Sequence, residues 1–314
     1  MRSEIPAMIS KYFWLPVRQT VKALTPGFVW QAAQSAWLAQ VGRDRLRRLL
    51  QDADSASDFS PLVTYLAYRG LANRLRAHIL AQDFALLTGR QLVVNWPSTP
   101  ECGAQFDDLF VWEGTERTIP NKDYCLVRYD RHKDWSSHDL AENLPHRSVI
   151  LDIHWQFIDR QPFETKLGAR LDAARSYLIP KPDILQEVDQ LCLNWSLSTI
   201  GVHIRRGDFT TKANQGVALE RYTRSIHQAL ETMGTDTTIY LASDGSQEEI
   251  APLLTEFGDR IINRPSFSRT STEGVRSALI DILLLSRTQF LILTPISTFG
   301  EMAAFLGKVP YTYA

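Results

Sequence analysis

Apolar residues along the chain fall into short β-rich runs that alternate with longer segments of helical spacing. Two such runs, LVTYLAY at 62–68 and QLVVNW at 91–96, flank a segment in which apolar residues such as Leu75 and Ile79 recur at helical intervals. This arrangement predicts a β-α-β unit.

The same alternation continues through the rest of the chain and is clearer after residue 180. Strands are predicted at 148–155, 199–204, 237–243, 260–262 and 289–293, and helices at 163–177, 184–194, 219–232, 246–257, 273–287 and through 301–307. Strands that alternate with helices of this length are typical of parallel sheets covered on both faces. We therefore predict an α/β fold.

The organisation into domains follows from length and from breaks in the pattern. A chain of 314 residues exceeds one usual domain, and the two prolines of IPKPD at 179–183 indicate a crossover. We expect a helical extension at 1–60, one Rossmann-like domain at 61–180 and a second at 181–314, with polar DADSASDFSP at 52–61 as a linker.

The predicted N-terminal helix carries four arginines, Arg43, Arg45, Arg47 and Arg48. A solvated polar helix face explains them, and peripheral contact with an anionic membrane is the alternative. No apolar run of spanning length occurs, because the longest one, at 278–296, is interrupted by charged and polar residues. With no recognisable secretory signal, we expect a cytoplasmic protein that is soluble or membrane-associated through this helix.

The charge balance and the cysteines exclude several classes of protein. The 34 basic residues against 35 acidic ones give a net charge of −1, so no global field favours nucleic acid. Cys102, Cys125 and Cys192 are odd in number and lack metal-ligand spacing, so neither a disulfide nor a zinc site is expected. An anionic ligand would have to be held by a local site.

The first candidate site follows the strand in TIGVHIRRGDF, at 199–209. His203, Arg205, Arg206 and Asp208 lie where this strand ends, and ligands of open α/β sheets bind beyond the carboxyl ends of strands. A guanidinium grips phosphate with two hydrogen bonds. From the pleat we expect His203 and Arg205 on one side and Arg206 on the other, as a structural salt-bridge partner. A surface turn with Arg–Asp pairs is the alternative.

Two more predicted strands end in polar residues. Ser243 and Asp244 follow the strand at 237–243, where an acidic residue accepts hydrogen bonds from a nucleoside, although Asp244 as a helix N-cap with Gln247 is the alternative. Ser297 and Thr298 begin the last helix, whose free N–H groups suit a phosphate, and Ser297 as a simple cap is the alternative there. Together the strand ends favour a nucleoside diphosphate.

Other nucleotide sites are disfavoured by what the sequence lacks. It contains neither a Gly-x-Gly-x-x-Gly fingerprint nor a phosphate loop ending in Gly-Lys-Ser or Gly-Lys-Thr. Paired aspartates do not follow a predicted strand, so no metal and no other cofactor is expected. In the first half, Asn73 lies between a strand and a helix, where it would face a ligand beyond that sheet.

Taken in order, these motifs resemble those of the fucosyltransferases that make α-1,2 and α-1,6 linkages or modify proteins. The resemblance covers about residues 199–307 and rests on HIRRGD at 203–208, SD at 243–244, STEGVRSALID at 271–281, DILLLS at 281–286 and STF at 297–299, with a weaker echo at 69–76. It implies a two-domain GT-B-like fold whose Rossmann-like domains face a cleft. It also implies GDP-fucose as donor, a glycan or glycoconjugate as acceptor, and inversion without a metal.

The resemblance also implies roles for individual residues. His203 and Asp244 would contact the guanosine, Arg205 the β-phosphate, and Ser297 and Thr298 the phosphates. Arg205 is the candidate catalytic residue, and the base stays unassigned. Ala72 stands where the family has a glycine. A nucleotide-binding protein that has lost transfer is one alternative function, and a membrane-surface adaptor acting through the N-terminal helix is another.

Overall fold

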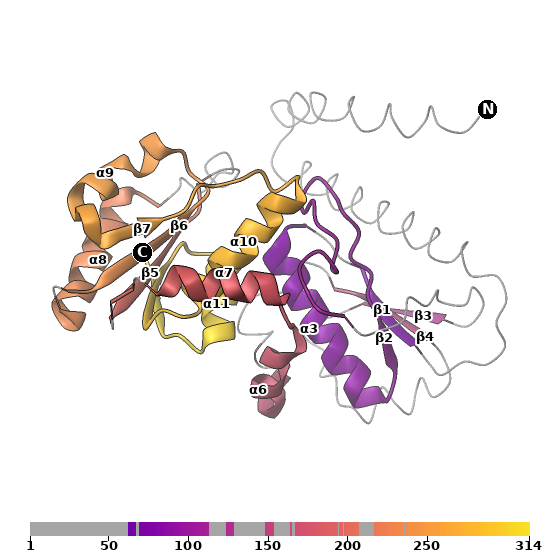
Figure 1. The fold of residues 1–314 in the computed structure, drawn as a ribbon. Coiled ribbons are helices and arrows are strands. Elements are labelled where there is room, and N and C mark those ends of the chain that lie inside the picture. The colour runs from indigo at the N-terminus through magenta and orange to yellow at the C-terminus, as the bar shows by residue number, and fades with distance from the viewer. Residues whose placement is uncertain are drawn as a thin grey trace, which may run out of the picture. The chain divides into compact units, whose positions relative to one another are not determined.

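The computed structural model describes residues 62–66, 69–112, 124–128, 148–153, 164, 167–193, 195–196, 198–206, 217–234 and 236–314 (Figure 1). The predicted helix and linker before residue 62 lie outside the described residues, and so does the candidate Asp208.

The first half forms a four-stranded parallel sheet in the order β2-β1-β4-β3. Helix α3 (Leu71–Thr88) connects β1 to β2, which confirms the predicted β-α-β unit. One strand was not predicted, β3, whose YCLVR sequence is too short to stand out from its surroundings. The strands are β1 (Leu62–Tyr65), β2 (Gln91–Val93), β3 (Tyr124–Arg128) and β4 (Ser148–Asp152).

The segment between the two sheets is helical, in short pieces. The helix predicted up to residue 177 is described from 167 on as two 3₁₀ turns around one short α-helix, and the next helix begins at a proline, which suits its first turn. These elements are η2 (Gly168–Arg170), α6 (Leu171–Ala174), η3 (Arg175–Tyr177) and α7 (Pro182–Cys192).

The second half forms a five-stranded parallel sheet in the order β7-β6-β5-β8-β9. The predicted strands and helices are all present, and the last strand, β9, was missed. The strands are β5 (Thr199–Ile204), β6 (Thr238–Ser243), β7 (Ile261–Asn263), β8 (Phe290–Leu293) and β9 (Tyr311–Tyr313). The helices are α8 (Leu219–Met233), α9 (Gln247–Phe257), η5 (Gly258–Arg260), α10 (Thr272–Leu285) and α11 (Thr298–Gly307).

Alternate residues of the second sheet pack into two different clusters, as the pleat of a covered strand requires. In β6, Ile239 and Leu241 pack with apolar residues of α8 and α9. Tyr240 and Ala242 of the same strand belong to the cluster that contains α10 and α11. The sheet therefore carries helices on both faces, as the sequence pattern predicted.

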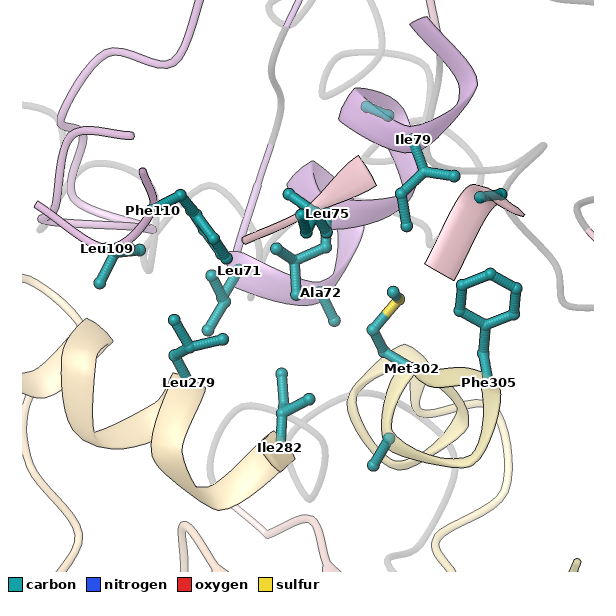
Figure 2. Packing of buried hydrophobic residues seen from close by; sticks show 14 of the residues in the cluster. Leu71, Ala72, Leu75, Ile79, Leu109, Phe110, Leu279, Ile282, Met302 and Phe305 are labelled. Carbon is teal, nitrogen blue, oxygen red and sulfur yellow. The ribbon is translucent and has the colours of Figure 1, made fainter. Parts of the chain in front are cut away.

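One hydrophobic cluster joins α3 of the first half to α10 and α11 of the second. Figure 2 shows Leu75 of α3 among residues that include Leu279 of α10 and Met302 of α11. A buried ion pair crosses the same contact: Arg76 Nη2 lies 2.8 Å from Glu301 Oε2, with side chains 1% and 9% exposed. Removing one partner of such a pair typically costs about 3–5 kcal/mol, because a buried charge is left unpaired.

Among the described residues, no helix is both long enough and apolar enough to cross a membrane.

Candidate functional site at the carboxyl edge of the second sheet

Three neighbouring strands of the second sheet end at the same edge. Strand β5 lies between β6 and β8, all three run parallel, and the register pairs Ile204 with Ser243 and His203 with Leu293. The polar groups that follow these strands are therefore brought together, as the sequence predicted.

Thr294 joins the turn after β8 to the turn after β5. Its Oγ1 accepts a hydrogen bond from the main-chain N–H of Arg205 at 2.8 Å and bonds the carbonyl oxygen of His203 at 2.9 Å. Tyr222 Oη lies 2.6 Å from the same atom, and because Oγ1 has a single proton, which goes to the carbonyl, the tyrosine is the donor. The buried Thr294 hydroxyl thus fixes where the backbone of Arg205 leaves the sheet.

Asp244 joins the turn after β6 to the same point. Its Oδ1 accepts a hydrogen bond from the main-chain N–H of Arg206 at 2.6 Å, and its Oδ2 lies 2.7 Å from Nη1 of Arg205. The side chains of Arg205 and Asp244 are 24% and 27% exposed, so this ion pair is open to solvent on one side. A carboxylate oxygen can accept more than one hydrogen bond, which leaves Asp244 able to bind a ligand as well.

Two sequence-based expectations about these residues are wrong. The salt bridge expected for Arg206 lies at Arg205, because the chain leaves the strand after Ile204 and the alternation of the pleat no longer decides which side chain faces Asp244. The alternative of Asp244 as a helix cap also fails. Ser246 caps α9, in a capping box in which its side chain accepts from the N–H of Glu249 at 3.2 Å.

Arg206 differs from Arg205 in how its side chain is satisfied. Its Nε is buried and has no hydrogen-bond partner among the described residues. Gly245 faces its stem, since a Cβ there would lie 3.0 Å from Arg206 Cγ. A buried polar atom without a partner in a native structure calls for an explanation such as an unseen ligand.

His203 lies beneath the start of α11. It is 4% exposed, and its ring stacks on Phe299 with centroids 4.9 Å apart. Burial, assisted by the positive charge of Arg205, lowers the pKa of His203 to about 3, so the ring is neutral. Its Nδ1 has no partner among the described residues, and a Cβ on Gly300 would come within 3.1 Å of it.

The amino end of α11 completes this edge of the sheet. Ser297 occupies the N-cap position, but its hydroxyl accepts no hydrogen bond from the helix backbone. The alternative that Ser297 serves as a simple side-chain cap is therefore wrong. The first-turn N–H groups of α11 therefore have no acceptor in the Ser297 side chain, and helix ends that bind phosphate have free N–H groups of this kind. Thr298, the first helical residue, is partly exposed.

The remaining candidates are placed as follows. Ser243 Oγ accepts from the N–H of Gly245 at 3.0 Å and so shapes the turn before α9. Asn73 lies in the first turn of α3, after the other sheet, and is partly buried. Asn73 therefore follows β1 of the first sheet, whereas the other described candidates follow strands of the second sheet.

Asp281, which marks one of the resembling motifs, has a structural role. Its Oδ1 accepts from Tyr240 Oη at 2.6 Å and from Arg264 Nη1 at 2.8 Å. Arg264 also reaches Glu187 of α7 at 3.1 Å. Burial raises the pKa of the Asp281 carboxyl, which its two partners counteract. This network holds α10 and α7 to the sheet.

No family model matches the sequence. No curated protein matches it significantly either.

Solved structures do match, over most of the chain. NodZ α-1,6-fucosyltransferase soaked with GDP-fucose aligns with a TM-score of 0.54 and 20% identity, over 79% of this chain and 93% of that one. NodZ is also represented by a structure from Bradyrhizobium, with a TM-score of 0.53. The chain has the fold of the fucosyltransferases.

Two further structures with this fold extend the likeness. A variant of Arabidopsis thaliana FUT1 in complex with GDP has a TM-score of 0.58 and 16% identity, over 86% of this chain and 74% of that one. POFUT1 in complex with GDP has a TM-score of 0.51 and 13% identity, over 82% and 99%. At these low identities the similarity concerns the fold, and it confirms the α/β, GT-B-like architecture expected from the sequence.

Proposed function

We propose that the protein is an inverting, metal-independent glycosyltransferase that transfers fucose from GDP-fucose to a glycan hydroxyl. The observation that carries the proposal is the network at the ends of β5, β6 and β8, in which Asp244 and Thr294 both hold the turn containing Arg205. The shared fold supports it, since structures with this fold contain GDP or GDP-fucose.

The donor would lie along the carboxyl edge of the second sheet. Asp244 and His203 would contact the guanosine, His203 through its unpartnered Nδ1. Ser297 and Thr298, at the uncapped start of α11, would bind the phosphates.

Arg206, Ser243 and Asp208 would complete the walls of the donor site, and Asn73 would approach from the other half of the chain. Arg206 brings to it the buried Nε that no described residue satisfies.

Arg205 would act on the leaving group. In the reaction an acceptor oxygen bonds to the anomeric carbon of fucose while the bond from that carbon to the β-phosphate oxygen breaks. The bonding electrons go to the phosphate, and the hydroxyl proton leaves to a base or to water. A guanidinium already held in place by Asp244 stabilises the growing charge without reorganising, which lowers the barrier.

The proposal of metal independence rests on the positively charged groups at this edge of the sheet. Arginines and a helix end provide positive charge where a metal would otherwise neutralise the diphosphate. The described part of the chain contains no cluster of three or more His, Cys, Asp or Glu residues able to hold a metal ion. Turnover that is abolished by EDTA and restored by Mn²⁺ would contradict this part of the proposal.

Isothermal titration calorimetry with GDP, GDP-fucose, ADP and NAD tests the donor. We expect binding of GDP and GDP-fucose and none of ADP or NAD. Absent binding of GDP, or equal binding of GDP and ADP, would overturn the assignment. Release of GDP from GDP-fucose then separates an active transferase, which hydrolyses its donor slowly, from a protein that only binds it.

A further inference from the structure

Ile296 adopts a backbone conformation that is unusual for its residue type. Its φ is +63°, and of the three non-glycine residues with positive φ in the described part of the chain, Arg69, Ile296 and Lys308, it alone is β-branched. A β-branched residue at positive φ is a genuine outlier, because its branched Cβ crowds the backbone. Such strain persists only where the surrounding structure enforces it, and it concentrates at ligand sites.

The turn around Ile296 explains how the strain is enforced. Ser297 N–H donates to the carbonyl of Thr294 at 3.4 Å, so Pro295 and Ile296 are the two central residues of a β-turn. Proline is favoured at the first central position, and a positive φ at the second is typical of a type II turn, where glycine is the usual residue. The chain keeps isoleucine where glycine would fit without strain.

The side chain that causes this strain is not used in the core. Ile296 is 72% exposed, while Thr294 and Ser297 on either side of it are buried. Burial therefore does not account for its presence. What sets Ile296 apart from other exposed apolar residues is its strained backbone beside a proposed phosphate site, and such strain is a reason to propose a ligand contact.

The ligand group that would meet Ile296 follows from its position. Ile296 directly precedes the uncapped start of α11, and the unpartnered Nδ1 of His203 lies under the same helix. The diphosphate proposed at this helix end joins the sugar of the donor to the guanosine. Because the guanosine is assigned to His203 and Asp244, the sugar is the group left for Ile296 to contact. A sugar that lacks its last hydroxyl, a 6-deoxysugar, carries a methyl group that an apolar side chain can cover.

We propose that Ile296 is a specificity-determining residue that contacts the methyl group of the donor's 6-deoxysugar. The inference rests on the proposed donor site and adds the residue that distinguishes a methyl-bearing sugar from one without it. Discrimination of a single such carbon in an apolar contact amounts to about tenfold or more.

The test compares wild type with Ile296→Gly by calorimetry and thermal melting. The ligands are GDP, GDP-fucose and GDP-D-arabinose, which is the same donor without the methyl group. We expect unchanged affinity for GDP and a preference for GDP-fucose over GDP-D-arabinose that falls about tenfold in the variant. The melting temperature should rise by about 1–4 °C, because glycine adopts positive φ without strain.

Lys308→Gly is the matched control. Lys308 also has positive φ, at the far end of the same helix, α11. We expect the melting temperature of this variant to rise by a similar amount, and its preference between the two donors to stay as in wild type. The control separates the release of strain from the loss of a sugar contact.

Each other outcome counts against the proposal. An Ile296→Gly protein that keeps the wild-type donor preference would overturn it, and so would a change confined to the KM of the acceptor. A lower melting temperature for Ile296→Gly would show that the turn is not strained. If the wild-type protein binds no GDP compound, the proposed function fails and this inference fails with it. If the wild type prefers GDP-fucose over GDP-D-arabinose and the variant shows the same preference, only this inference is overturned.

Discussion

The two sheets use arginine differently at their carboxyl edges. After the first sheet, Arg74 is fully buried and its guanidinium bonds the carbonyls of Arg69 and Pro97 and the hydroxyl of Thr99, at 2.6–2.8 Å. After the second sheet, Arg205 is partly exposed beside Asp244, and Arg206 Nε has no partner among the described residues. A guanidinium whose hydrogen bonds go to the surrounding fold serves stability, and our proposal assigns the guanidinium at the open edge to a ligand.

The two buried histidines differ in which ring nitrogen lacks a partner. Nδ1 of His78 lies 3.0 Å from Tyr65 Oη, and its ring stacks on Phe106 with centroids 4.6 Å apart. Nδ1 of His203 has no such partner in the described part of the chain. Nε2 of His78 also lacks a partner among the described residues, so the contrast between the two halves rests on Arg74 and Arg205. Four predictions test it.

The largest effect is expected for Arg205→Lys. Lysine can keep the ion pair with Asp244, and so the fold, but it loses the planar pair of donors that grips a phosphate. We expect kcat for transfer or donor hydrolysis to fall about 100- to 1,000-fold, roughly 3–4 kcal/mol, with little change in melting temperature. Arg206→Lys is the matched control, and if it loses turnover while Arg205→Lys keeps most of it, the roles of the two arginines are reversed.

Arg74→Met should affect stability instead. The variant keeps an apolar stem but leaves three acceptors without the donors that now satisfy them. We expect the free energy of unfolding in urea to fall by about 3 kcal/mol, while the folded protein binds GDP with wild-type affinity. Weaker GDP binding at unchanged stability would show that Arg74 serves the site and would remove the contrast.

Acid should destabilise the protein through both histidines. Burial lowers the pKa of His78 and of His203 to about 3, so between that value and the unfolded pKa near 6.5 the unfolded chain binds more protons. Each residue should therefore lower the free energy of unfolding by about 2 kcal/mol from pH 7 to pH 5. The His78→Phe variant should lose its share of this pH dependence, and an unchanged slope would refute the account.

Thr294→Val should have the smallest effect of the four. The substitution keeps the shape of the side chain but removes the acceptor of the Arg205 N–H and the partner of Tyr222. We expect a loss in kcat of about tenfold, near 1.4 kcal/mol, because the turn that positions Arg205 is loosened. The paired substitution Thr288→Val, at a buried hydroxyl that bonds the carbonyl of Leu285 just before the amino end of β8 and so at the opposite edge of the sheet, should leave kcat unchanged. Equal losses in both variants would mean that Thr294 acts through stability alone.

The elements that the sequence predicted well are those with long periodic patterns. Helices α8, α10 and α11 and strands β5, β6 and β8 lie within a few residues of their expected bounds. The strands that were missed, β3 and β9, have five and three residues and lie at sheet edges, where few neighbours impose a pattern. Short edge strands form because a neighbouring strand offers hydrogen bonds, and that neighbour is distant in sequence.

The sequence by itself determined that polar residues after three strands would meet, because parallel strands place their carboxyl ends at one edge. Only the tertiary structure decided that Arg205 pairs with Asp244, that Ser246 caps α9, and that Ile296 lies at positive φ. The physical reason is the separation along the chain between the residues that interact. Hydrophobic periodicity is set by neighbours along the chain, whereas Arg206 and the carboxylate that binds its N–H are 38 residues apart and meet only across the assembled sheet.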